Sequence, residues 1–73
     1  MIEQSLLYKM GYRIKTRELH DGSSDFVHPD KKRRYLANYK DGEVNIVFPT
    51  IDKRQIITFS DSGEFEDWHN EYE

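Results

Sequence analysis

Two alternating segments, 33–40 and 43–49, flank the two-residue loop Asp41-Gly42, and together they form the clearest pattern in the chain. A two-residue Asp-Gly loop predicts a type I′ β-hairpin and determines which residues face each other. In this register one face carries only apolar and aromatic pairs: Tyr39–Val44, Ala37–Ile46 and Tyr35–Phe48. The other face carries the pairs Lys40–Glu43, Asn38–Asn45 and Leu36–Val47, of which the first two are favourable polar contacts.

A further strand is predicted at about 55–59, with the sequence QIITF, and it returns along the hairpin. If its loop centres on Asp52-Lys53, Phe48 pairs with Ile57 and Ile46 pairs with Phe59, which extends the apolar face. The opposite face then brings together three apolar residues: Leu36, Val47 and Ile56. These three form either an exposed apolar patch or a surface that lies beneath a helix.

Residues 12–19 also alternate and predict a strand near the start of the chain. One face of this strand carries Tyr12, Ile14 and Thr16, and the other carries a basic row: Arg13, Lys15 and Arg17. A turn-forming segment, 20–25, leads to a short strand at Phe26 and Val27, which Pro29 stops.

Helical spacing predicts two short helices, at 2–10 and at 61–72. The first has an apolar stripe and ends at Gly11; the stripe consists of Ile2, Leu6, Leu7 and Met10. The second begins at the N-cap residue Asp61, with Glu64 at the capping-box position. Its apolar face carries Phe65, Trp68 and Tyr72.

These elements predict one small α+β domain over 1–73. The sheet is an antiparallel β-meander of four strands, within a range of three to five, and short N-terminal and C-terminal helices pack on it. The expected core consists of Leu6, Met10, Ile14, Tyr35, Ala37, Val44, Ile46, Phe48, Ile57, Phe59, Phe65 and Trp68. Because so short a chain buries a limited share of its surface, a partner protein or a homodimer is a natural source of further stability.

Composition narrows the function classes. There is no apolar run long enough for a membrane span, no signal-peptide pattern and no cysteine, so we expect a cytoplasmic protein with no membrane contact. No nucleophile motif or glycine-rich phosphate loop is present, so we expect a non-enzymatic protein without a cofactor. The one combination with metal-ligand chemistry is His20, Asp21, Asp25 and His28. Counted from Asp21, it fails the EF-hand pattern at both the glycine and the glutamate positions, and we expect no metal.

The formal charge of −3 conceals an asymmetry along the chain. Residues 1–40 carry nine basic and five acidic side chains, whereas 41–73 carry two basic and nine acidic side chains. The first part is therefore +4 and the second is −7. Such an uneven distribution of charge along the chain is typical of a protein that binds a charged partner.

The first functional hypothesis is a small protein-binding module or inhibitor, of a phage or mobile-element type. Its contact surface is either the acidic and aromatic C-terminal helix or the sheet face. The candidate protein-binding residues are Glu64, Glu66, Asp67, Glu71, Leu36, Val47 and Ile56. Such a helix could also imitate the charge of DNA, although −3 is low for a DNA mimic.

The alternative hypothesis is a nucleic-acid-binding domain with a basic strand and turn surface. Its candidate residues are Arg13, Lys15, Arg17, Lys31, Lys32, Arg33 and Arg34. The hairpin register places Tyr35 and Tyr39 on the core face, which removes both from stacking on bases. The sequence assigns no role to His69.

Overall fold

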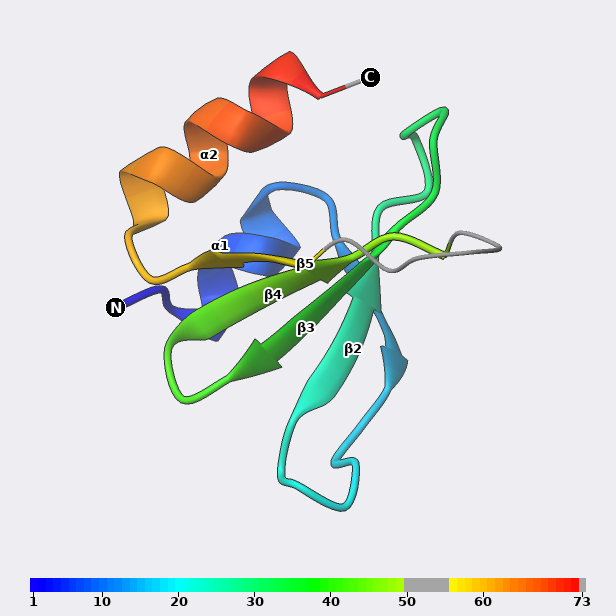
Figure 1. Cartoon of the computed structure of the whole chain (residues 1–73), viewed down its shortest axis with the longest axis vertical. Coiled ribbons are helices and arrows are strands. Elements are labelled where there is room, and N and C mark those ends of the chain that lie inside the picture. The colour runs from blue at the N-terminus through cyan, green and yellow to red at the C-terminus, as the bar shows by residue number, and fades with distance from the viewer. Residues whose placement is uncertain (50–55, 73) are drawn as a thin grey trace.

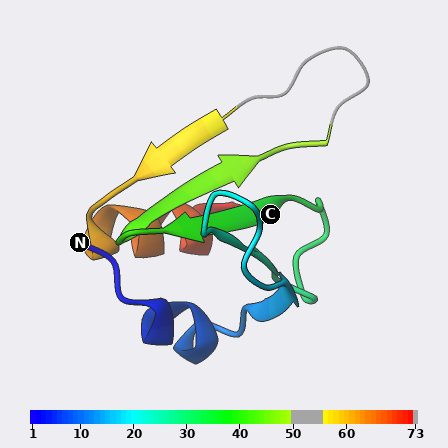
Figure 2. The ribbon, with the colours of Figure 1, turned by 90° about the horizontal axis from the view of Figure 1, so that it is seen from below.

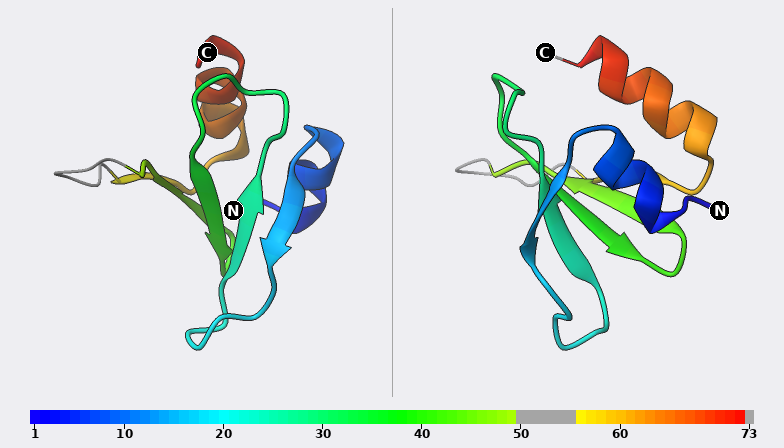
Figure 3. Two further views of the ribbon diagram at one scale, coloured as in Figure 1. Left: turned by 90° about the vertical axis from the view of Figure 1, so that its right-hand side faces the viewer. Right: turned by 180° about the vertical axis from the view of Figure 1, so that it is seen from behind.

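The computed structural model describes residues 1–49 and 56–72 (Figure 1). Five antiparallel strands form one sheet in the order of the chain, so the sheet is a simple meander. The elements are α1 (Gln4–Lys9), β1 (Arg13–Thr16), β2 (Ser24–Val27), β3 (Leu36–Lys40), β4 (Glu43–Val47), β5 (Ile56–Phe59) and α2 (Ser62–Glu71). The strands fan out from β5 to β2 as the sheet twists (Figures 1 and 3). The predicted α+β fold is confirmed, with a five-stranded sheet.

The β3–β4 hairpin has the predicted register, from Lys40 opposite Glu43 to Leu36 opposite Val47. Both loop residues have positive φ, 48° at Asp41 and 82° at Gly42, as a type I′ turn requires. The start of the chain lies across this turn. The N–H of Ile2 donates to the carbonyl of Gly42 at 2.8 Å, and a Cβ at Gly42 would meet the side chain of Met1.

The predicted register of β5 is wrong by two residues. Ile57 lies opposite Ile46, and Phe59 lies opposite Val44. Because side chains alternate with a period of two, a two-residue shift leaves each side chain on its expected face. The shift brings Phe59 to the start of α2, where its ring lies 5.7 Å from that of Phe65. The predicted loop centre at Asp52-Lys53 lies outside the described residues.

An irregularity in β1 changes the expected basic row. Ile14 lies opposite Phe26, but Thr16 lies opposite Asp25, so the pairing skips at Lys15. Such a bulge breaks the alternation of side chains along the strand. The expectation that Arg13, Lys15 and Arg17 share one face is therefore wrong. Arg17 borders a depression on the α1 side of the sheet, which Gln4 and Tyr8 also line.

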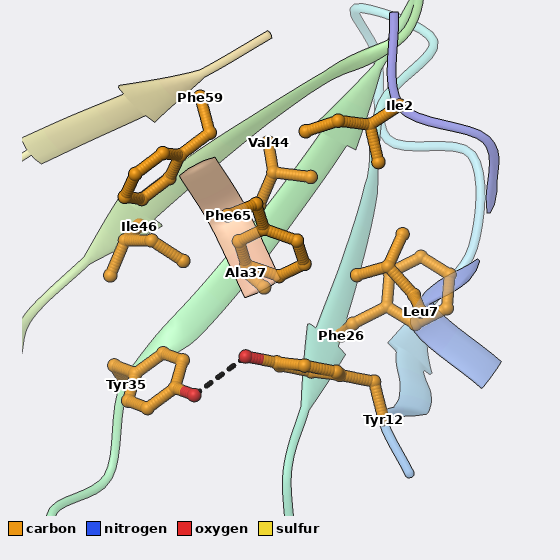
Figure 4. Close-up of a cluster of buried hydrophobic side chains, with 10 residues drawn as sticks. All are labelled: Ile2, Leu7, Tyr12, Phe26, Tyr35, Ala37, Val44, Ile46, Phe59 and Phe65. Carbon is orange, nitrogen blue, oxygen red and sulfur yellow. Dashed lines mark hydrogen bonds between the residues drawn. The ribbon is translucent and has the colours of Figure 1, made fainter. Parts of the chain in front are cut away.

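Both helices pack on the same face of the sheet, and both lie below β4 and β5 in Figure 2. Leu7 of α1 and Phe65 of α2 are fully buried there with Ala37. The buried core consists of Ile2, Leu7, Tyr12, Phe26, Tyr35, Ala37, Val44, Ile46, Phe59 and Phe65 (Figure 4). Six of the twelve predicted core residues are in this set, and the other six are partly buried against it: Leu6, Met10, Ile14, Phe48, Ile57 and Trp68. The prediction missed Ile2, Leu7, Tyr12 and Phe26.

The helix ends follow the capping residues. The backbone at Glu3 is extended, so α1 begins at Gln4 and Ile2 stays outside the helix. Gly11 has a φ of 96°, and α1 ends just before it, as its position predicted. At the start of α2, the carboxylate of Asp61 accepts a hydrogen bond of 3.0 Å from the N–H of Glu64, which confirms the predicted N-cap.

Lys31, in the segment between β2 and β3, forms hydrogen bonds with the C-terminal end of α2. Its ammonium donates to the carbonyl of His69, and also to that of Tyr72 at 2.6 Å. The last carbonyls of a helix lack partners within the helix and lie at the negative end of its dipole. Lys31 therefore both satisfies and neutralises the C-terminal end of α2.

Replacement of Lys31 by methionine removes these bonds while it keeps most of the apolar stem. We expect the free energy of unfolding of Lys31→Met to fall by about 1–2 kcal/mol in urea denaturation. The neighbouring Lys32 is exposed, so Lys32→Met is a matched control and should change stability by less than about 0.5 kcal/mol. Equal stabilities of the two variants would contradict this role of Lys31.

Candidate functional site

The sheet face opposite the helices carries a row of apolar side chains. Val47 pairs with Leu36 on one side and with Ile56 on the other. The pairing of Phe26 with Ala37 makes Val27 the next neighbour of Leu36, so the row crosses four strands. Both helices lie on the other face, and the side chain of Ile56 is 63% exposed. Leu36, Val47 and Val27 are half-buried. The predicted apolar grouping is thus present, and within the described residues it does not lie beneath a helix.

Beside this row lies a polar row whose side chains bond to one another. The amide of Asn38 donates to the carboxylate of Asp25 at 2.8 Å, and it also contacts the hydroxyl of the buried Ser23. On the next pair of strands, the hydroxyl of Thr58 donates to Asn45 at 2.7 Å. The polar side chains of this row already form hydrogen bonds with one another. A ligand on this face would therefore gain most free energy by burying the apolar row.

A concavity of about 300 Å³ lies where β2 ends and β3 begins, next to the apolar row. Apolar groups and two prolines form much of its wall, and two cations border it. The lining residues are Lys15, Val27, His28, Pro29, Arg34, Tyr35, Leu36 and Pro49. We use the name open face for the surface formed by this concavity and the apolar row of Val27, Leu36, Val47 and Ile56.

The structure divides the seven candidate residues of the nucleic-acid hypothesis. Lys15 and Arg34 border the concavity of the open face. Arg13 pairs with Val27 and lines a separate depression next to Tyr8 of α1. Lys32 and Arg33 are exposed in the connection that precedes β3. The ammonium of Lys31 is bound to the end of α2, and Arg17 lies on the α1 side. The structure therefore gathers two of the seven, Lys15 and Arg34, at one concavity.

The acidic candidates lie on the other side of the molecule. Three of them, Glu64, Asp67 and Glu71, are exposed on α2, and Glu66 is half-buried. The aromatic side chains of α2 point inward: Phe65 is fully buried, and Trp68 lies 5.2 Å from Tyr35, ring centre to ring centre. The sheet thus separates the acidic helix from Leu36, Val47 and Ile56, and the two groups of candidate protein-binding residues form two surfaces.

A buried chain of three polar side chains connects the sheet to α2. The hydroxyl of Tyr12 contacts that of Tyr35 at 2.6 Å (Figure 4) and Nδ1 of His69 at 2.9 Å. Tyr12 and Tyr35 precede β1 and β3, and His69 is in the last turn of α2. Sequence analysis gave His69 no role, although its position four residues after Phe65 puts it on the same helix face.

Burial determines the protonation of these three groups. It lowers the pKa of His69 to about 4, and the charges of Lys31 and His28 act in the same direction. Burial also raises the pKa of Tyr12 far above its usual range, helped by the hydrogen bond to Tyr35, and it raises the pKa of Tyr35. At neutral pH the phenols therefore keep their protons and His69 is uncharged, as a structural network requires.

Of the four residues with metal-ligand chemistry, His28, Asp21 and Asp25 have separate partners, and His20 is exposed. Nε2 of His28 donates to the carbonyl of Met10 at 2.9 Å, and its Nδ1 accepts from the N–H of Asp30. Hydrogen bonds from Ser23 lower the pKa of Asp21, and Asp25 is bonded to Asn38. In residues 1–49 and 56–72 no three histidine, aspartate or glutamate side chains come together as a metal site.

Comparisons with protein-family models, with curated proteins and with solved structures found no match to this chain. None of the helices in the described part of the chain has the length and apolar content that would let it cross a membrane.

Tyr12→Phe tests the buried network, because it removes one hydroxyl and keeps the ring. The change leaves the hydroxyl of Tyr35 and Nδ1 of His69 without their partner, so we expect the free energy of unfolding to fall by about 1–3 kcal/mol. Tyr8 is 49% exposed, and Tyr8→Phe is the matched control, with little expected change in urea denaturation. A Tyr12→Phe variant as stable as the control would contradict the assignment.

The lowered pKa of His69 predicts a dependence of stability on pH. In the unfolded chain this imidazole binds a proton below about pH 6.5, but in the folded protein only below about pH 4. Stability is therefore complete above pH 6.5 and falls as the pH drops toward 4, by about 1–3 kcal/mol from this group. Denaturation curves at several pH values should show that the free energy of unfolding falls less between pH 6.5 and 4 in His69→Gln than in the wild type. The exposed His20 is the control, and His20→Gln should keep the wild-type loss.

Proposed function

We propose that the protein is a non-enzymatic binding module or inhibitor that holds a partner protein against its open face. The observation that carries the proposal is the apolar row across four strands on the side opposite α1 and α2. The centre of a protein–protein interface is apolar and well packed, and this row offers such a centre with cations at its border. The proposal favours the open face over α2, because the aromatic side chains of α2 are packed inward.

Two further observations support a binding module. The groups with strongly perturbed pKa values, Tyr12 and His69, are buried and bonded to one another, which suits stability more than catalysis. Small secreted domains usually hold disulfides, whereas this sequence has no cysteine, which fits an intracellular protein. A phage or mobile-element inhibitor is part of the same proposal, since it is a class of small intracellular binding proteins.

Nucleic-acid binding is the second candidate function, because Lys15 and Arg34 border the concavity of the open face. It is less well supported, since single-stranded nucleic acids bind through aromatic stacking as well as through charge. Tyr35 and Phe48 pack instead against α2, where Trp68 and Tyr72 contact both rings.

Site-specific photo-crosslinking tests the proposal. A photoreactive amino acid at position 56, on the open face, should capture a discrete partner protein in cells of the source. The same amino acid at position 67, on the outer side of α2, is the matched control and should not. Val47→Lys should abolish capture from position 56, because it places a charge in the centre of the apolar row.

Three outcomes would contradict the proposal. Capture from position 67 alone would assign the interface to α2. Binding of mixed-sequence DNA or RNA at low salt, lost in Arg34→Glu, would favour the nucleic-acid function, because phosphate contacts are strongest at low salt. A concentration-dependent dimer that Val47→Lys dissociates would identify the occupant of the open face as a second copy of the chain.

A further inference from the structure

The concavity at the end of the open face combines apolar walls with positive charge. Val27 and Leu36 belong to the apolar row, and Pro29 and Pro49 add rigid apolar surface. Lys15 and Arg34, both exposed, border the same space from β1 and from the segment before β3. An apolar side chain and an anionic group could occupy this site together.

The charges of the open face are arranged so that this end is positive. No aspartate or glutamate of the described residues lines the concavity. Of the acidic side chains on this side of the sheet, Asp25 already accepts a hydrogen bond from Asn38. Glu43 lies opposite Lys40 at the far end, beside the hairpin turn. The cations at the concavity thus face solvent with no described carboxylate in the site, and they attract anions.

Two residues that line the concavity, His28 and Tyr35, are fixed by contacts with the rest of the protein. His28 is bonded on both ring nitrogens, to Met10 and to Asp30. Tyr35 is 4% exposed and bonds to Tyr12, while Trp68 packs against its ring. A site whose walls are already ordered loses less entropy when it binds a ligand. The ring of Tyr35 is buried, so it offers no open face on which a base could stack.

We propose that this concavity binds an acidic segment of the partner protein, and in particular an apolar side chain that has carboxylates beside it. The apolar side chain lies against Val27 and Leu36, and the carboxylates pair with Lys15 and Arg34. The planar guanidinium of Arg34 can hold a carboxylate with two parallel hydrogen bonds. This inference rests on the proposed function and specifies the chemistry of the partner.

A titration followed by NMR tests the inference with defined probes. The probes are a short acetylated peptide of alternating Leu and Glu, the matched peptide of Leu and Lys, and a short oligo-dT. We expect the Leu/Glu peptide to shift the amide signals of Val27 and Leu36, and we expect the other two probes to leave them unchanged. Arg34→Glu should lower the affinity for the Leu/Glu peptide about fivefold or more, since it replaces an attraction between opposite charges with a repulsion.

Arg17→Glu is the matched control, because it makes the same change of charge on the α1 side of the sheet. Arg17→Glu should lower the affinity for the Leu/Glu peptide less than about twofold. The inference is overturned if the Leu/Lys peptide or oligo-dT binds the same residues as well, or if Arg17→Glu acts as strongly as Arg34→Glu. Absence of Leu/Glu binding at about 2 mM peptide would also overturn it.

Two further results separate this inference from the proposed function. If position 56 captures a partner equally well in the wild type and in Arg34→Glu, the carboxylate contact is wrong and the open face remains the docking surface. If position 56 captures nothing while the Leu/Glu peptide binds the concavity, the site is supported without the larger interface. Signals of Val27 and Leu36 that shift with protein concentration alone would instead assign the site to a second copy and overturn the inference.

Discussion

In the described part of the chain, two short helices cover the five-stranded sheet, and both pack on the same face. Six residues of α1 and ten of α2 provide one layer over the buried side chains of the strands. Within the described residues neither helix covers the opposite face, which carries Leu36, Val47 and Ile56. The same arrangement separates the charges, since the acids of α2 lie on one side and the cations around the concavity on the other. The asymmetry along the sequence thus becomes an asymmetry between two surfaces.

The contact of Tyr12 with His69 is central to this arrangement. It joins residues 57 positions apart, and the ring of Tyr12 also lies 5.7 Å from Phe65. Burial of three polar groups is favourable only when each has a partner, so the network requires one position of α2 over the sheet. Lys31 adds a second tie between the end of α2 and the β2–β3 connection. The concavity lies directly beside this junction, so the site that we propose for ligand binding is built against the best-anchored part of the helix layer.

The sequence predicted most of this fold, because most of it follows local rules. The Asp41-Gly42 turn, the N-cap at Asp61 and the glycine at the end of α1 each depend on a few adjacent residues. The errors have non-local causes. The register of β5 depends on how Phe59 meets α2, and the bulge at Lys15 depends on the pairing with β2. The candidate site was predicted in part: Leu36, Val47 and Ile56 came together as expected. Val27 joins them through the pairing of β2 with β3, and Pro29 and Pro49 line the neighbouring concavity from segments outside the strands, which alternation alone does not reveal.

The meander topology has a consequence for how the chain folds. Every strand pairs with the next strand along the chain, so each step of sheet formation closes a short loop and costs little entropy. The β3–β4 hairpin, with its two-residue turn, is the least costly place to begin. The hydrogen bonds of His69 with Tyr12 and of Lys31 with Tyr72 join residues 57 and 41 positions apart, and they connect groups that only a formed sheet brings near. The sheet thus grows from strands that are neighbours in sequence, whereas the contacts of α2 depend on residues that lie far from it along the chain.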